Sequence, residues 1–198
     1  ISKLMKKKNF VHIGNHKTAT TSVQYFLFKN KKYLLSKNLV YAVGGGIDYN
    51  NNNVSWEAIN HFYFKKNRQN IKDLLSVIKI NKDKNILISS ENLENLKYNS
   101  KFKNFIKQIK KSHKIEIVWT IREQFAYLMS LLTTLMNKGA FVSNFDHLVN
   151  KIKKGKFYFP PYIFWFNYDS QYKRICKIYN VQKKDIKLII YSKNTNIF

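Results

Sequence analysis

The most informative stretch of the chain, residues 10–22, reads FVHIGNHKTATTS. It opens on a short β-branched and aromatic run that is typical of a buried strand, and Gly14 ends that run. A turn with one Lys and several hydroxyl residues follows, and helical spacing of apolar residues begins at about Thr20. Such a unit directs backbone N–H groups, the positive end of a helix dipole and one cation to a single point. This composition indicates a phosphate-binding turn.

The rest of the chain repeats the alternation of strand and helix. Apolar residues at three- and four-residue steps lie between the apolar runs and predict amphipathic helices. Residues 127–178 break the rhythm and predict several consecutive helices, interrupted at Gly139, Gly155 and Pro160-Pro161. The alternation favours a three-layer α/β fold, in which a mostly parallel central sheet is flanked by helices. The predicted buried strands are residues 10–14, 39–43, 85–89, 115–121 and 186–191.

Length and composition suit a single domain with a hydrophobic core. Of the 198 residues, 44% are hydrophobic and 16% aromatic, which excludes disordered and fibrous classes. A single Cys, Cys176, excludes a disulfide framework. No apolar run reaches the roughly 18 residues that a membrane span requires, and residues 1–14 are too polar for a signal peptide. We therefore expect a cytoplasmic protein that is not transmembrane.

The net charge of +25 is open to two interpretations. A charge of this size is typical of nucleic-acid-binding proteins, and of proteins that associate peripherally with acidic membranes or polyanions. All but three of the cations are Lys, however, whereas phosphate and base recognition favours the planar Arg fork. The abundance of Lys, Asn and Ile also fits AT-rich coding DNA. We expect no specific nucleic-acid partner, and a basic nucleic-acid-binding module stays the alternative function.

The turn after the first strand resembles the 5′-phosphosulfate-binding loop of sulfotransferases that use 3′-phosphoadenylyl sulfate (PAPS). That loop has the motif K-[TS]-G-T-[TS]. The resemblance implies that Lys17 holds the 5′-phosphosulfate and its bridging oxygen, and that the backbone and hydroxyls of Thr18, Thr20 and Thr21 bind phosphate oxygens. The family Gly is Ala19 here. If this position requires a positive φ, Ala19 carries a steric cost of about 1 kcal/mol.

Two simpler interpretations of the same turn exist. One of the hydroxyl residues Thr20, Thr21 and Ser22 could be an ordinary helix N-cap, which would leave Lys17 unexplained. The turn could also belong to a P-loop kinase or NTPase. A Walker A loop places a second Gly directly before its Lys, and no such Gly is present, so this function is less favoured.

A second motif follows the predicted strand at residues 115–121. Arg122 ends this strand and Ser130 lies eight residues later, just over two helical turns into the next predicted helix. In sulfotransferases an Arg and a Ser at these positions bind the 3′-phosphate of the nucleotide, and the resemblance implies this role here. Taken alone, Arg122 could simply form a surface ion pair with Glu116 or Glu123.

Together the two motifs resemble bacterial carbohydrate-type sulfotransferases over residues 11–191. The resemblance implies a P-loop-NTPase-like sulfotransferase fold and transfer of a sulfuryl group from PAPS to an acceptor hydroxyl, with PAP released. The expected acceptor is a glycan or another hydroxyl compound. The family usually continues beyond the strand at residues 186–191, so we expect residues 1–198 to form one sulfotransferase-like domain, with C-terminal truncation left open.

The chemistry also requires a base for the acceptor proton. Glu91 follows the predicted strand at residues 85–89, a position similar to the strand end where sulfotransferases carry a catalytic Glu or His. We expect Glu91 to be the base and His16, inside the turn, to be the second candidate. Glu91 could instead favour the dipole of a short helix capped by Ser89 or Ser90. The His residues show no metal-ligand spacing, so no metal is expected.

Overall fold

The computed structural model describes residues 6–42, 68–95, 100–137, 139, 150, 152–159 and 162–192. Five strands form one sheet in the order β2-β3-β1-β4-β7, and every pairing is parallel. The predicted three-layer α/β class with a mostly parallel central sheet is therefore confirmed. The strands are β1 (Lys7–Gly14), β2 (Leu39–Tyr41), β3 (Asn85–Ser89), β4 (His113–Arg122) and β7 (Ile186–Tyr191).

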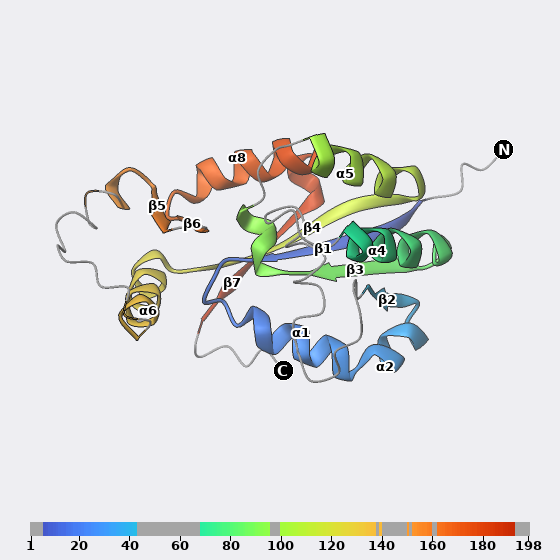
Figure 1. Ribbon diagram of the computed structural model, residues 1–198, viewed down its shortest axis with the longest axis horizontal. Coiled ribbons are helices and arrows are strands. Elements are labelled where there is room, and N and C mark those ends of the chain that lie inside the picture. Colours follow the sequence, from blue (N-terminus) through green and yellow to red (C-terminus); the bar gives the residue numbers. More distant parts are fainter. Residues whose placement is uncertain are drawn as a thin grey trace.

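Helices cover both faces of this sheet (Figure 1). On one face lie α1 (Thr20–Lys29) and α2 (Lys31–Ser36). On the other lie α5 (Ser100–Ser112) and α8 (Tyr168–Tyr179), with α4 (Arg68–Ile80) packed into the same core. Alternate strand residues such as Val11, Ile13 and Ile117 are buried in this core. Because side chains alternate along a strand, Phe10 and His12 face α1 instead.

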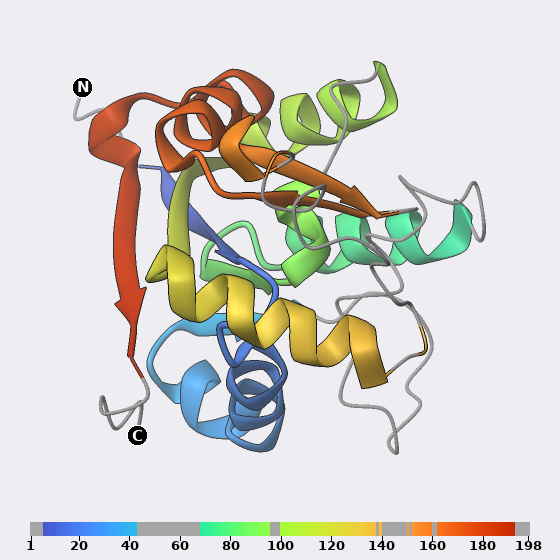
Figure 2. The same ribbon diagram turned by 90° about the vertical axis from the view of Figure 1, so that its left-hand side faces the viewer.

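The carboxyl ends of the central strands meet at one edge of the sheet. Figure 2 looks onto this edge, with α6 (Gln124–Asn137) crossing in front of it. There β1 leads into the turn before α1, β3 leads into the 3₁₀ helix η1 (Glu91–Asn95), and β4 leads into α6. The two predicted motifs and Glu91 therefore lie at neighbouring strand ends, where ligands bind in open α/β sheets.

Residues 127–178 differ from the predicted series of helices. Between α6 and α8, β5 (Lys156–Phe159) and β6 (Tyr162–Trp165) form an antiparallel hairpin, so the prediction is wrong there. Aromatic residues favour strands, and alternation puts Phe157 and Phe164 into a second small core with Tyr127 of α6. The Pro160-Pro161 pair between these strands lies outside the described residues, as does Val43 at the end of the predicted second strand.

Candidate active site

The turn between β1 and α1 is shaped by two residues in the left-handed region. Lys17 has φ 69° and Ala19 has φ 56°. The positive φ at Ala19 explains why this position favours Gly, and it costs an L-residue about 1 kcal/mol. A Cβ on Gly14 would lie 1.9 Å from Cγ2 of Thr20, so only Gly lets the turn close against the start of α1. The turn is therefore compact, and its shape requires Gly at position 14.

Helix α1 begins without a side-chain cap. Its N-cap residue is Ala19, and no side chain bonds the first backbone N–H groups of the helix. The alternative that a hydroxyl residue of the turn is an ordinary N-cap is therefore wrong. The N–H groups at the start of α1 lie beside Lys17, whose side chain is exposed. This arrangement of donors and one cation suits an anion.

The predicted hydroxyl ligands of the turn take different places. The Thr18 hydroxyl is buried and donates to the carbonyl of Asn15 at 2.6 Å, which closes the turn. The Thr20 hydroxyl is also buried and donates to Oε2 of Glu91 at 2.6 Å. Thr21 is exposed. Two of the three hydroxyls therefore stabilise the turn itself, and the predicted ligands that stay exposed are the Thr21 hydroxyl and the Lys17 side chain.

A cavity of about 880 Å³ brings the two predicted motifs together. Arg122 at the end of β4 is nearly buried, and its Nη1 donates to the carbonyl of Lys17 at 3.2 Å. The guanidinium also lies 5.5 Å from the ring centroid of Tyr191. Lys17, Arg122 and Ser130 all line this cavity, together with Glu123, Phe125, Ala126, Met129, Thr133, Thr134, Asn137, Ile190, Tyr191 and Ser192.

The acids near Arg122 have other partners. Glu116 forms an ion pair with Lys8 at 3.0 Å. Glu123 accepts backbone hydrogen bonds from Ala126 at 2.7 Å and Phe125 at 2.8 Å, and these lower its pKa below the ordinary Glu value. Glu123 thus caps the start of α6. The guanidinium of Arg122 is oriented by the turn, and its side chain lines the cavity.

Glu91 lies beside the turn, as the order of the strands requires. Strand β3 pairs with β1, and the backbone N–H of Ser90 donates to the carbonyl of His12 at 3.2 Å. Glu91 then begins η1, and its carboxylate accepts from Thr20. The structure therefore brings the expected base into contact with the first residue of α1.

His12 is a buried histidine of the sheet, as its place in the strand predicts. Its Nδ1 lies 2.7 Å from the Ser89 hydroxyl and its Nε2 lies 3.0 Å from the Thr120 hydroxyl. Burial lowers its pKa to about 4, so the ring is neutral near pH 7.

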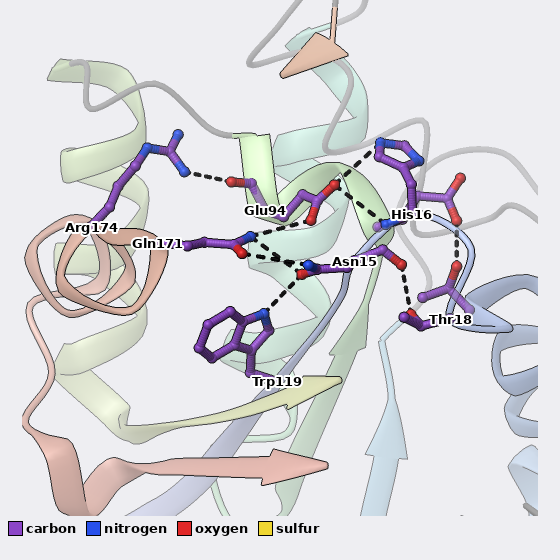
Figure 3. A network of polar contacts seen from close by, with 9 residues as sticks. Asn15, His16, Thr18, Glu94, Trp119, Gln171 and Arg174 are labelled. Atoms are coloured by element: carbon purple, nitrogen blue, oxygen red, sulfur yellow. Dashed lines mark hydrogen bonds and ion pairs between the residues drawn. The ribbon is translucent and has the colours of Figure 1, made fainter. Parts of the chain in front are cut away.

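The sequence analysis missed one residue at this edge. Glu94 has a fully buried side chain under the turn. Its Oε1 lies 3.4 Å from the backbone N of His16 and 3.5 Å from Nε2 of His16, while its Oε2 accepts from Gln171 of α8 at 3.3 Å (Figure 3). Burial raises its pKa well above the ordinary Glu value, and the N–H groups of His16 and Gln171 oppose this.

In the sequence, only the scarcity of Arg pointed toward Glu94, and this indication was weak. Arg174, one of three Arg in the chain, donates to the carbonyl of Glu94 and lies 5.1 Å from the ring centroid of Trp165. The scarcity of Arg marks both Arg122 and Arg174, yet only Arg122 belongs to a motif.

Within the described ranges, no cluster of three or more His, Cys, Asp and Glu residues is suited to a metal ion. No helix in the same ranges is long and apolar enough to cross a membrane.

No model of a protein family matches the chain, and no curated protein matches it either. Among solved structures, the chain is similar to a sulfotransferase from Alicyclobacillus acidocaldarius. The TM-score is 0.51 and the sequence identity is 12%, over 93% of this chain and 73% of that chain. At this identity the similarity shows the fold alone. The protein thus has a sulfotransferase-like α/β fold.

Proposed function

We propose that the protein is a sulfotransferase that moves a sulfuryl group from PAPS to an acceptor hydroxyl and releases PAP. The observation that carries this assignment is that Lys17, Arg122 and Ser130 line one and the same cavity. These residues come from the turn after β1, the end of β4 and the middle of α6. The sulfotransferase-like fold supports the same function.

The charged and polar groups that line this cavity suit the two charged groups of PAPS. Lys17 and the N–H groups at the start of α1 would hold the 5′-phosphosulfate, with Ala19, Thr20 and Thr21 supplying the backbone. The backbone N–H of Thr18 donates to the Asn15 carbonyl at 3.2 Å and so shapes the turn. Arg122 and Ser130 would hold the 3′-phosphate, because a guanidinium fork and a hydroxyl both donate to phosphate oxygens. The volume of about 880 Å³ lies within the usual range for ligand sites.

The residues at this edge also match what sulfuryl transfer requires. The acceptor oxygen attacks sulfur as the bond from sulfur to the bridging oxygen breaks, so negative charge develops on the leaving phosphate. Lys17 would be the cation that neutralises that charge. Glu91 and His16 are the two candidates for the group that takes the acceptor proton. We infer that the acceptor is a glycan or another hydroxyl compound.

A thermal-shift experiment tests the nucleotide site. At about a hundred times its Kd, PAP should stabilise the protein by about 2.7 kcal/mol, a rise of roughly 5–10 °C in Tm. Lys17→Ala should abolish this rise. Lys29→Ala is the matched control, because Lys29 is an exposed lysine at the other end of α1, and it should keep the rise. The proposed function fails if neither PAP nor PAPS changes the Tm of the wild-type protein.

A further inference from the structure

The face of the sheet that α1 covers is packed less completely than the opposite face. On the opposite face, Val11, Ile13 and Ile117 are at most 2% exposed. On the α1 face, Phe10 and Val118 of the same two strands are only half-buried. Strands in a parallel sheet are normally buried on both faces, so the central strands β1 and β4 depart from this rule on one side.

A second cavity, of about 580 Å³, lies between this face and α1. Its lining comes from α1 and from all five strands, from Leu39 of β2 across to Ile189 of β7. Because neighbouring strands are about 4.8 Å apart, the cavity spans roughly 19 Å, with a mean cross-section of about 30 Å². This long and narrow shape suits one extended alkyl chain. The apolar residues of its wall include Phe10, Val23, Leu27, Leu87, Val118 and Ile189.

The polar residues of the same cavity lie toward the carboxyl ends of the strands. Thr120 and Tyr191 belong to the last turns of β4 and β7, and Thr18 belongs to the turn after β1. Ile190 and Tyr191 line both this cavity and the cavity proposed to bind PAPS, so the two cavities adjoin. A ligand with its chain in the apolar cavity would therefore direct its head group to this junction.

The charges around the junction favour a negative head group. No acid is found among the described residues that line the apolar cavity, and α1 and α2, which cover this face, contain neither Asp nor Glu. The adjoining cavity is lined by the cations Lys17 and Arg122. Glu123, the acid among its described lining residues, accepts two backbone hydrogen bonds at the start of α6. An anionic head group is thus complementary in charge to the polar end.

We propose that the cavity between α1 and the sheet binds the alkyl chain of an anionic amphiphile, such as a long-chain carboxylate, with its head group at the junction beside Lys17 and Arg122. Burial of the chain against apolar side chains supplies most of the affinity. The narrow cross-section fits a single chain and not the surface of a bilayer. This binding goes beyond the proposed function and does not depend on it.

Calorimetric titration of the wild-type protein with hexanoate, octanoate and decanoate, each below its micelle-forming concentration, tests the chain site. The affinity should rise about fourfold for each added methylene group. Octanol, which has the chain of octanoate without its charge, should bind about fivefold more weakly at low salt.

Two neighbouring residues of β7 provide a matched pair of variants. Ile189 pairs with Thr120 and lines the cavity, whereas Leu188 pairs with Trp119 on the opposite face. Their exposed fractions are similar, at 48% for Ile189 and 53% for Leu188. Ile189→Gln should weaken octanoate binding about tenfold, and Leu188→Gln should leave it unchanged.

Several results would overturn the inference. Affinity that does not depend on chain length would do so, as would equal losses of affinity in the two variants, or octanol that binds as tightly as octanoate. A wild-type dimer that Ile189→Gln dissociates would assign the cavity to a second copy of the chain. Binding to phosphatidylserine vesicles without binding of octanoate would assign it to a membrane.

The chain-length series with the wild-type protein decides the question if Ile189→Gln does not fold. No nucleotide is present in these titrations. Failure of PAP to bind would therefore contradict the proposed function and leave the titrations unchanged.

Discussion

At the scale of single residues, the turn before α1 contains a strained backbone conformation at Ala19. Ala19 has φ 56°, where an L-residue is disfavoured by about 1 kcal/mol and Gly is not. The sulfotransferase loop that this turn resembles has Gly at this position, so this chain carries a steric cost that a Gly would avoid. The turn keeps this conformation because Gly14 lets it pack closely against Thr20. The Thr18 hydroxyl also donates to the Asn15 carbonyl, and the Thr20 hydroxyl donates to Glu91.

Substitution of Ala19 tests this strain. Ala19→Gly should raise the free energy of unfolding by up to about 1 kcal/mol, because relief of the positive φ exceeds the extra entropy of Gly in the unfolded chain. Ala126→Gly, inside α6, is the control and should lower it by about 1 kcal/mol. Urea denaturation measures both. Equal losses of stability in the two variants would show that the backbone at Ala19 is not strained.

His12 gives the fold a dependence on pH. Its pKa is about 4 in the folded protein and about 6.5 in the unfolded chain, so only the unfolded chain binds this proton in between. Stability should therefore fall as the pH drops from about 6.5 to 4, by up to about 3 kcal/mol from this residue. The measurement is urea denaturation across this range for the wild-type protein and His12→Asn. Parallel curves for the two proteins would refute the assignment.

At the scale of elements, the junction of β4 and α6 brings Arg122 and Ser130, the two groups proposed to bind the 3′-phosphate, to one cavity. Arg122 precedes the helix, and Ser130 lies two turns into it on the side that lines the cavity. Ser130→Ala should weaken PAP binding about tenfold, which corresponds to one lost hydrogen bond to a charged group. Thr133→Ala is the control, because Thr133 lines the same cavity but its hydroxyl donates to the carbonyl of Met129 at 2.9 Å.

Calorimetric titration with PAP compares these variants. Arg122→Lys should weaken binding more than Ser130→Ala, because Lys keeps the charge but loses the planar fork. Equal PAP affinity in Ser130→Ala and the wild-type protein would show that Ser130 of α6 does not contribute to PAP binding.

The central strands β1, β3 and β4 were predictable because their apolar runs are largely buried. The predicted burial of residues 186–191 is wrong, because β7 is an edge strand in which Leu188, Ile189 and Ile190 are exposed.

The start of β1 was not predictable, since Lys7, Lys8 and Asn9 are polar and yet pair with β4 from His113 to Ile115. Ladder hydrogen bonds continue there beyond the core, and the ion pair of Lys8 with Glu116 covers the strand start. The hairpin of β5 and β6 was missed because its aromatic residues pack against α6, a contact that periodicity does not reveal.

The candidate site was predictable where residues lie close in sequence. Lys17 and Thr20 share one turn, and Arg122 and Ser130 share one strand and helix. The partnership of Glu94 with Gln171 was not predictable, because the two residues are 77 positions apart and meet only when α8 packs over η1. A short polar segment such as η1 also has no pattern that distinguishes a buried acid from an exposed one.

At the scale of the whole molecule, the chain has a net charge of +25, and Lys17 and Arg122 are the cations among the described residues that line the cavity. Lys17 and Arg122 would bind the nucleotide, and the remaining cations would attract polyanions without specificity. We expect duplex DNA to bind weakly, with a steep loss of affinity as salt rises and no effect of Lys17→Ala. Fluorescence anisotropy across salt concentrations measures this. Tight binding at physiological salt that Lys17→Ala abolishes would favour a nucleic-acid-binding function.

The most direct measurement of the central claim is a crystal structure of the protein with PAP. The 3′-phosphate should lie within hydrogen-bond distance of Arg122 and Ser130, and the 5′-phosphate should lie on Lys17 and the N–H groups that begin α1. A structure in which PAP binds outside this cavity, or with its phosphates away from these residues, would contradict the assignment.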